Sequence, residues 1–176
     1  VYLALYLGGI LVNALFLARA YPETVARRSE SGGMKDWDKV VGGLWGMAYF
    51  VAVPVISGLD ARLGWTGKTD LVVHLAGIMG FALGFAIFSW AMMENAYFST
   101  EGLVQEEQGH RVCTSGPYRV VRHPGYFGAI LQSLSSPLVL GSVWALLPGT
   151  MAAVLMVVRA ALEDRTLHKV LAGYPD

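Results

Sequence analysis

The chain is divided into long uncharged runs by short polar segments. No Asp, Glu, Lys or Arg occurs in four stretches: Val1–Ala18, Val40–Leu59, Leu71–Met93 and Pro124–Val158. A helix that crosses the hydrocarbon core of a bilayer needs about 20 mainly apolar residues, because it rises about 1.5 Å per residue. Each of the first three runs therefore predicts one transmembrane helix.

The fourth run is too long for one span and slightly short for two full spans joined by a turn. It predicts a tight helical hairpin that turns near Gly141–Ser142, with Pro148 early in the second helix, where its missing N–H is tolerated. A turn at Pro148–Gly149 is the alternative. With either turn, both ends of the hairpin return to the same side. The pattern thus predicts an all-α integral membrane protein with five transmembrane helices.

We expect a single domain, with no internal repeat. Residues 1–93 would form three N-terminal spans, residues 94–123 a connecting segment, and residues 124–176 the hairpin and a C-terminal segment. Gly42-x-x-x-Gly46 and Gly80-x-x-x-Gly84 suit close contact between helices, since small residues let backbones approach in lipid. Val1–Ala18 lacks a basic flank and a clear cleavage site, which favours a retained span over a signal peptide.

Composition agrees with the membrane prediction and excludes some functions. Only 15% of residues are charged, against about 25% in soluble domains. The formal net charge of zero argues against nucleic acid as a partner. The single cysteine, Cys113, excludes an internal disulfide and a cysteine-built metal site. The histidines do not show metal-ligand spacing, so no metal site is predicted.

The distribution of Lys and Arg predicts the orientation. The segments Arg19–Lys39, Glu94–His123 and Arg159–Asp176 carry five, three and three such residues, and Asp60–Asp70 carries two. Cytoplasmic loops are enriched in Lys and Arg. We therefore expect a multi-pass protein with the first three of these segments in the cytoplasm and the Asp60–Asp70 loop outside.

The stretch SGPYRVVRHPGYFG places basic and aromatic residues directly before the hairpin. Pro124 suits the start of a helix, which puts His123 near the N-cap and Arg122 at the membrane surface. A helix N-terminus has unpaired N–H groups and a partial positive charge, so it binds anions. Tyr118 and Tyr126 add aromatic faces. The alternative is an ordinary interfacial belt of Arg and Tyr at headgroup depth.

A second polar cluster lies where the last helix leaves the membrane, at VVRAALEDRTLHK. Arg159 and Glu163 are four residues apart, so they share a helical face, and Asp164 is adjacent. The hairpin would bring this cluster to the Arg122–His123 entrance and form one cytoplasmic pocket. The alternative is a surface ion pair between Arg159 and Glu163, which would contribute little.

Together, GHRVCTSGPYRVVRHPGYFG and RAALEDRTL resemble the isoprenylcysteine carboxyl methyltransferase-like family, a membrane group related to phospholipid N-methyltransferases. The resemblance covers roughly Asn95 to the end of the chain. It implies methyl transfer from S-adenosylmethionine at the cytoplasmic face, with the cofactor bound by the R-H-P segment and the acidic pair. By position, it implies that the cofactor is lined by Val112, Gly116, Tyr118, His123, Pro124, Tyr126, Glu163 and Asp164.

The chain departs from the family pattern at two of these places. Asp164 stands where relatives commonly carry a second glutamate, which shortens the side chain that would reach the cofactor. Gly125, between Pro124 and Tyr126, stands where relatives often carry a bulkier residue. We expect a wider pocket there.

The residue types suit this cofactor, which carries a sulfonium, an ammonium and a carboxylate. Glu163 and Asp164 can pair with the ammonium, and Arg122 or the helix N-terminus can take the carboxylate. A tyrosine face near the sulfonium would add a cation–π contact of about 0.5–2 kcal/mol. We expect Arg159 to orient the acceptor and Glu163 to act as a base, which an amine or thiol acceptor needs and a carboxylate does not.

The acceptor and two other functions stay open at this point. A prenylated cysteine carboxylate, a phospholipid amine or a small thiol would serve, and a lipophilic acceptor would enter from the membrane lipids between helices. A sterol-type reductase using NADPH is the first alternative function, with Arg111, Arg119 and Arg122 binding its phosphates. A non-catalytic membrane scaffold is the second.

Overall fold

A computed structural model of the protein describes residues 36–95 and 113–170, together with six isolated helical positions near the N-terminus (8, 11, 14, 15, 18 and 19). Within residues 36–95 and 113–170 all regular structure is helical. The elements in chain order are α3 (Asp36–Gly46), the π-helix η1 (Met47–Ala52), α4 (Val53–Leu63), α5 (Leu71–Glu94), the 3₁₀-helix η3 (Gly116–Arg119), α6 (Pro124–Leu140) and α7 (Leu146–Val170).

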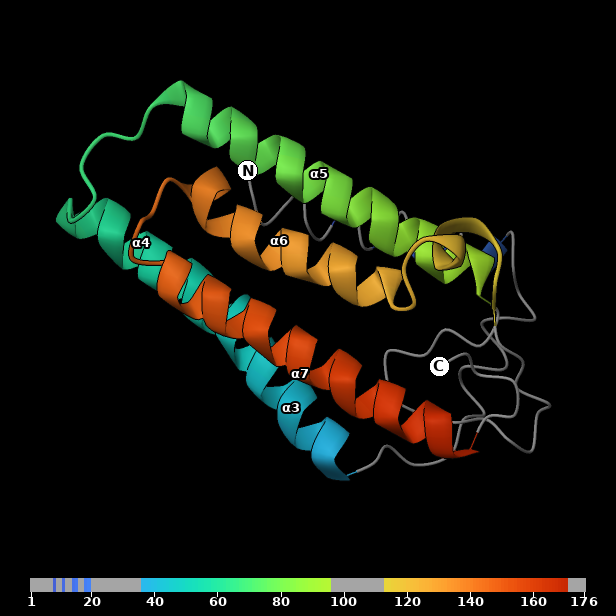
Figure 1. Ribbon diagram of the computed structural model, residues 1–176. Coiled ribbons are helices and arrows are strands. Elements are labelled where there is room, and N and C mark those ends of the chain that lie inside the picture. Colours follow the sequence, from blue (N-terminus) through green and yellow to red (C-terminus); the bar gives the residue numbers. More distant parts are fainter. Residues whose placement is uncertain are drawn as a thin grey trace.

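Three helical stretches are long and apolar enough to cross a membrane, namely Asp36–Leu63, Leu71–Glu94 and Leu146–Lys169. The first is the continuous rod α3–η1–α4. The shorter α6 packs between α5 and α7 (Figure 1). The outer faces of α5 and α7 expose large apolar side chains, including Val72, Met79 and Val154. Lipid-facing surfaces have this character. These findings confirm a membrane protein whose described residues are all-helical. The expected first span, Val1–Ala18, falls almost wholly outside the described residues, and the 17-residue α6 is not among the three stretches. Five spans therefore stay a prediction.

The hairpin turns where the pattern predicts. α6 ends just before Gly141, which has a φ of +69°, a left-handed conformation that glycine adopts without steric cost. The N–H groups of Gly141 and Ser142 donate to carbonyls in the last turn of α6. Pro148 and Gly149 lie inside the first turns of α7. The alternative turn at these two residues is therefore wrong.

α5 and α6 approach each other through their backbones. A Cβ added to Gly84 would lie 2.7 Å from the carbonyl oxygen of Gly128, and one added to Gly128 would lie 2.6 Å from that of Gly84. A Cβ on Gly77 would lie 2.5 Å from the backbone nitrogen of Val139. Close contact at Gly80-x-x-x-Gly84 is thus confirmed, and Gly77 extends it by a turn.

We expect Gly84→Ala to lower the melting temperature in detergent, because the new methyl group has backbone rather than a movable side chain in its way. Overpacking of this kind costs about 1–3 kcal/mol. The matched control is Gly58→Ala in α4, where an added Cβ meets nothing within 4 Å. The control should be neutral or slightly stabilising. Thermal unfolding is monitored by tryptophan fluorescence. Equal melting temperatures for the two variants would contradict the close packing.

The α3–η1–α4 rod packs against α7 around η1. Ala48 and Tyr49 of η1 and Ala152 of α7 form a buried apolar cluster, joined by Trp45. The hydroxyl groups of Tyr49 and Ser136 lie 3.2 Å apart, which links η1 to α6. This packing fixes α3 beside the later turns of α7 (Figure 1).

Candidate active site

The start of α6 meets the last turns of α7 at the end of the bundle opposite Gly141 (Figure 1). We call this the His123 end. Pro124 is the first residue of α6 and His123 is its N-cap, as the sequence predicts. The His123 carbonyl accepts the N–H of Phe127 at 3.1 Å. The fixed φ of proline suits this first position, so the local sequence itself sets the helix start beside α7.

Asp164 of α7 gathers three basic side chains. Its carboxylate lies 3.2 Å from His123 Nε2, 3.8 Å from Arg122 Nη1 and 3.4 Å from His168 Nε2. Arg122 Nη1 and His168 Nε2 also lie 3.5 Å apart. The side chains of Arg122 and Asp164 are 43% and 28% exposed, so solvent weakens their ion pair. Such contacts can be exchanged for those of a ligand at small cost.

A second set of contacts between α6 and α7 joins Tyr126 to Glu163 and Arg159. The Tyr126 hydroxyl donates a hydrogen bond to Glu163 Oε2. The Arg159 guanidinium carbon lies 5.6 Å from the centroid of the Tyr126 ring, within cation–π range. The rings of His123 and Tyr126 are 5.7 Å apart. Tyr126 therefore lies close both to His123, which pairs with Asp164, and to Arg159.

Arg159 is buried and is held by a residue that the sequence did not indicate. Its Nε donates to Asp38 Oδ1 at 2.6 Å and its Nη2 donates to Asp38 Oδ2 at 2.9 Å. Asp38 is fully buried, and Arg159 is 7% exposed. The alternative of a surface ion pair between Arg159 and Glu163 is therefore wrong. Charges at membrane depth are expected to pair inside the bundle. This rule could have indicated that Arg159 needs an acidic partner, but not that Asp38 is that partner.

Gly116 and Tyr118 lie against α5. Gly116 has a φ of +53°, and a Cβ there would lie 2.7 Å from the Glu94 side chain. The Tyr118 hydroxyl donates to the Ala91 carbonyl at 3.4 Å. These contacts anchor η3 to the end of α5. Val112 lies outside the described residues.

The structure thus brings six of the expected residues together between α6 and α7: Arg122, His123, Pro124, Tyr126, Glu163 and Asp164, with Arg159 beside them. His168 and Asp38 are additions. Among the described residues, no group of three or more His, Cys, Asp or Glu side chains is arranged to hold a metal ion. The site therefore offers the carboxylates of Glu163 and Asp164, the guanidinium of Arg122 at its rim, the ring of Tyr126 and the N-terminus of α6.

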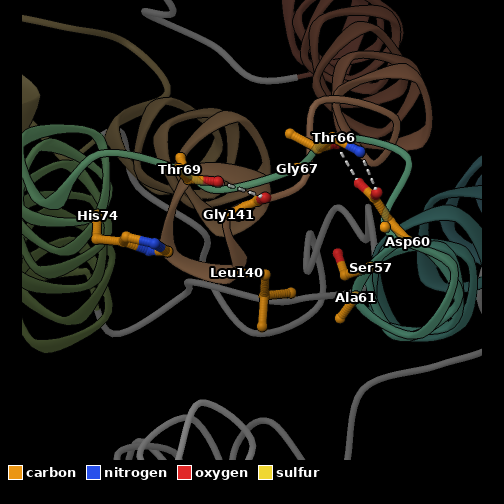
Figure 2. Close-up of a pocket in the computed structure, with 10 residues that line it drawn as sticks. Ser57, Asp60, Ala61, Thr66, Gly67, Thr69, His74, Leu140 and Gly141 are labelled. Carbon is orange, nitrogen blue, oxygen red and sulfur yellow. Dashed lines mark hydrogen bonds between the residues drawn. The ribbon is translucent and has the colours of Figure 1, made fainter.

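A polar pocket of about 290 Å³ lies at the Gly141 end. Figure 2 shows Asp60 and His74 on opposite sides of it. Asp60 accepts hydrogen bonds from the Thr66 N–H at 2.7 Å and from the hydroxyls of Thr66 and Ser142. The Thr69 hydroxyl donates to the Gly141 carbonyl at 2.9 Å. These contacts hold the loop after α4 against the hairpin turn.

The geometry at the His123 end agrees with a comparison to protein families. No curated protein matches the chain. The family model for isoprenylcysteine carboxyl methyltransferase (ICMT) matches residues 76–169, more than half of the chain. The match begins within α5, earlier than the motifs indicated, and it includes α6 and the described polar turns of α7. The protein therefore belongs to the isoprenylcysteine carboxyl methyltransferase family of membrane methyltransferases.

Proposed function

We propose that this protein transfers a methyl group from S-adenosylmethionine to a lipophilic or small acceptor at the His123 end, which we expect to face the cytoplasm. The observation that carries the proposal is the meeting of the R-H-P segment with the acidic pair. His123 contacts Asp164 and Tyr126 contacts Glu163, and the intervening chain folds back as a hairpin to allow both. Membership of a methyltransferase family supports the same reaction.

The charged groups present suit S-adenosylmethionine. Glu163 and Asp164 can accept hydrogen bonds from its ammonium group. Arg122 and the N–H groups of the α6 N-terminus can bind its carboxylate. The Tyr126 ring provides an aromatic face for the sulfonium. When bound, this cofactor supplies an electrophilic methyl group. The residues of the chain have to hold the donor and the acceptor in line and exclude water.

Arg159 and Glu163 are proposed to act on the acceptor. Arg159 is a buried cation one helical turn from Glu163, so it can orient a polar acceptor head whose apolar tail lies among the helices. Glu163 can take the proton that an amine or thiol acceptor loses on methylation. A carboxylate acceptor, such as that of a prenylated cysteine, would leave this proton step unused.

The cofactor assignment is tested by calorimetric titration of the detergent-purified protein with S-adenosylhomocysteine. We expect binding by the wild type and a roughly 10- to 100-fold weaker affinity for Asp164→Ala, since a hydrogen bond to a charged group contributes about 1.5–3 kcal/mol. The matched control is Asp36→Ala, which removes an exposed aspartate paired with Lys39 and should leave the affinity unchanged.

Two results would contradict this function. Folded wild-type protein that binds no S-adenosylhomocysteine would exclude the cofactor, and binding of NADPH in its place would indicate a reductase.

Acceptors are then compared by transfer of labelled methyl groups to S-farnesyl-N-acetylcysteine, phosphatidylethanolamine vesicles and a long-chain alkyl thiol. We expect one of these three chemical classes to become labelled.

A further inference from the structure

Asp38 is a charged residue in an unusual place. It lies in the first turn of α3 and is fully buried, whereas Asp36 in the same turn is exposed. Its bidentate ion pair joins it to a residue 121 positions later in the chain. A buried carboxylate is costly unless it is paired and hydrogen-bonded. The pairing with Arg159 therefore sets the positions of both side chains.

The guanidinium of Arg159 has neighbours on two elements, α3 and the Tyr126 ring of α6. A Cβ added to Gly42, one turn after Asp38, would lie 3.9 Å from the guanidinium carbon. A Cβ at this distance makes an ordinary van der Waals contact, so the guanidinium lies beside this turn of α3, next to the Asp38 carboxylate. The Tyr126 ring lies 5.6 Å from the same carbon. Because a bidentate pair also fixes the plane of the guanidinium, its orientation is set along with its position.

Glu163 is the other carboxylate that could attract this guanidinium. It follows Arg159 by four residues on α7, a spacing at which opposite charges meet on one helical face. In the structure two guanidinium nitrogens are instead directed to Asp38, and Glu163 accepts the Tyr126 hydroxyl. Asp38 thus competes with Glu163 for the same cation.

We propose that Asp38 is a positioning residue of the methyl-transfer site: it holds the Arg159 guanidinium against α3 and Tyr126, and so leaves the Glu163 carboxylate to Tyr126 and to the acceptor. The proposal rests on the methyl-transfer function proposed above. It adds a residue from outside the matched region 76–169. Without Asp38, the guanidinium would turn toward Glu163 and neutralise the proposed base.

The test compares Asp38→Asn, Asp38→Glu and the control Asp36→Asn in detergent-purified protein. We expect Asp38→Asn to lower kcat/KM for the acceptor that the wild type methylates about 10- to 100-fold, the effect of misplacing a reacting group by about 1 Å. The dissociation constant for S-adenosylhomocysteine should change less than threefold. Asp38→Glu should recover part of the rate, and Asp36→Asn should match the wild type.

A double-mutant cycle separates positioning from a structural role. If Asp38 acts through Arg159, Asp38→Asn should lower the rate no further once Arg159→Gln is present, because coupled residues are not additive. Additive losses, or wild-type turnover in Asp38→Asn, would overturn the proposal. If Asp38→Asn alone does not fold, the double variant Asp38→Asn/Arg159→Gln is compared with Arg159→Gln alone. Equal rates for the two would support the proposal, and a slower double variant would overturn it.

A measurement that needs no acceptor keeps this proposal apart from the proposed function. The Nε–H resonance of Arg159 in protein labelled with ¹⁵N-arginine is assigned by its absence in Arg159→Lys. Its exchange with solvent should be at least about tenfold faster in Asp38→Asn than in the wild type, since the Nε–H loses a charge-assisted acceptor. Equal exchange rates would overturn the positioning. Failure of the wild type to methylate any acceptor would instead overturn the methyl-transfer function.

Discussion

Glu163→Gln is expected to lower kcat about 10²- to 10⁴-fold with an amine or thiol acceptor, the usual contribution of a positioned general base. Glutamine has nearly the same shape as glutamate, so the Tyr126 hydroxyl keeps an oxygen to donate to, but the amide cannot take a proton. The measurement is transfer of labelled methyl groups at saturating S-adenosylmethionine, so that a weaker cofactor affinity does not lower the rate.

Two comparisons make the Glu163 prediction specific. Tyr126→Phe removes the hydrogen-bond donor and leaves the carboxylate, so we expect a smaller loss of about tenfold, from poorer orientation of Glu163. A carboxylate acceptor should be methylated by Glu163→Gln at close to the wild-type kcat, because that reaction releases no proton from the acceptor. An undiminished kcat with an amine or thiol would refute the role of Glu163 as a base.

The parts of the site that could be predicted from the sequence depend on short-range rules. The turn at Gly141–Ser142 follows from the glycine at the helix end, and the start of α6 follows from Pro124. The hairpin between them brings Tyr126 to Glu163 and His123 to Asp164. The expectation that the two clusters lie together needed only helix geometry and a turn; which side chains touch is known only from the structure.

The contacts that were not predicted join segments far apart in the chain. Asp38 stands among Lys35, Asp36 and Lys39, and nothing in that polar stretch distinguishes the one carboxylate that is buried. Its role depends on how α3 packs against α7, which the hydrophobic pattern does not specify. The spacing Gly42-x-x-x-Gly46 predicted close contact between helices. Among the described residues, however, a Cβ on Gly42 would meet only the Arg159 guanidinium, at 3.9 Å, and one on Gly46 only Phe50, so the close contact is not seen there.

The buried pair also makes Arg159 important for stability. We expect Arg159→Met to lower the free energy of unfolding by about 3–5 kcal/mol, because it leaves the Asp38 carboxylate buried without its cation. Methionine fills much of the same volume, so the loss reports the stranded charge rather than a cavity. The free energy is measured by titration with SDS in mixed micelles. The matched control is Arg62→Met in α4, which replaces an exposed arginine and should change stability little.

A second variant separates the cost of the stranded charge from the value of the ion pair. Asp38→Leu combined with Arg159→Met removes both charges, and replacing a buried ion pair by apolar side chains is often neutral or stabilising. We therefore expect the double variant to recover most of the stability lost in Arg159→Met while remaining unable to orient the acceptor. Recovery of stability without recovery of methyl transfer would mean that this pair is retained for the reaction. A double variant as unstable as Arg159→Met would instead mean that the ion pair itself holds α3 against α7.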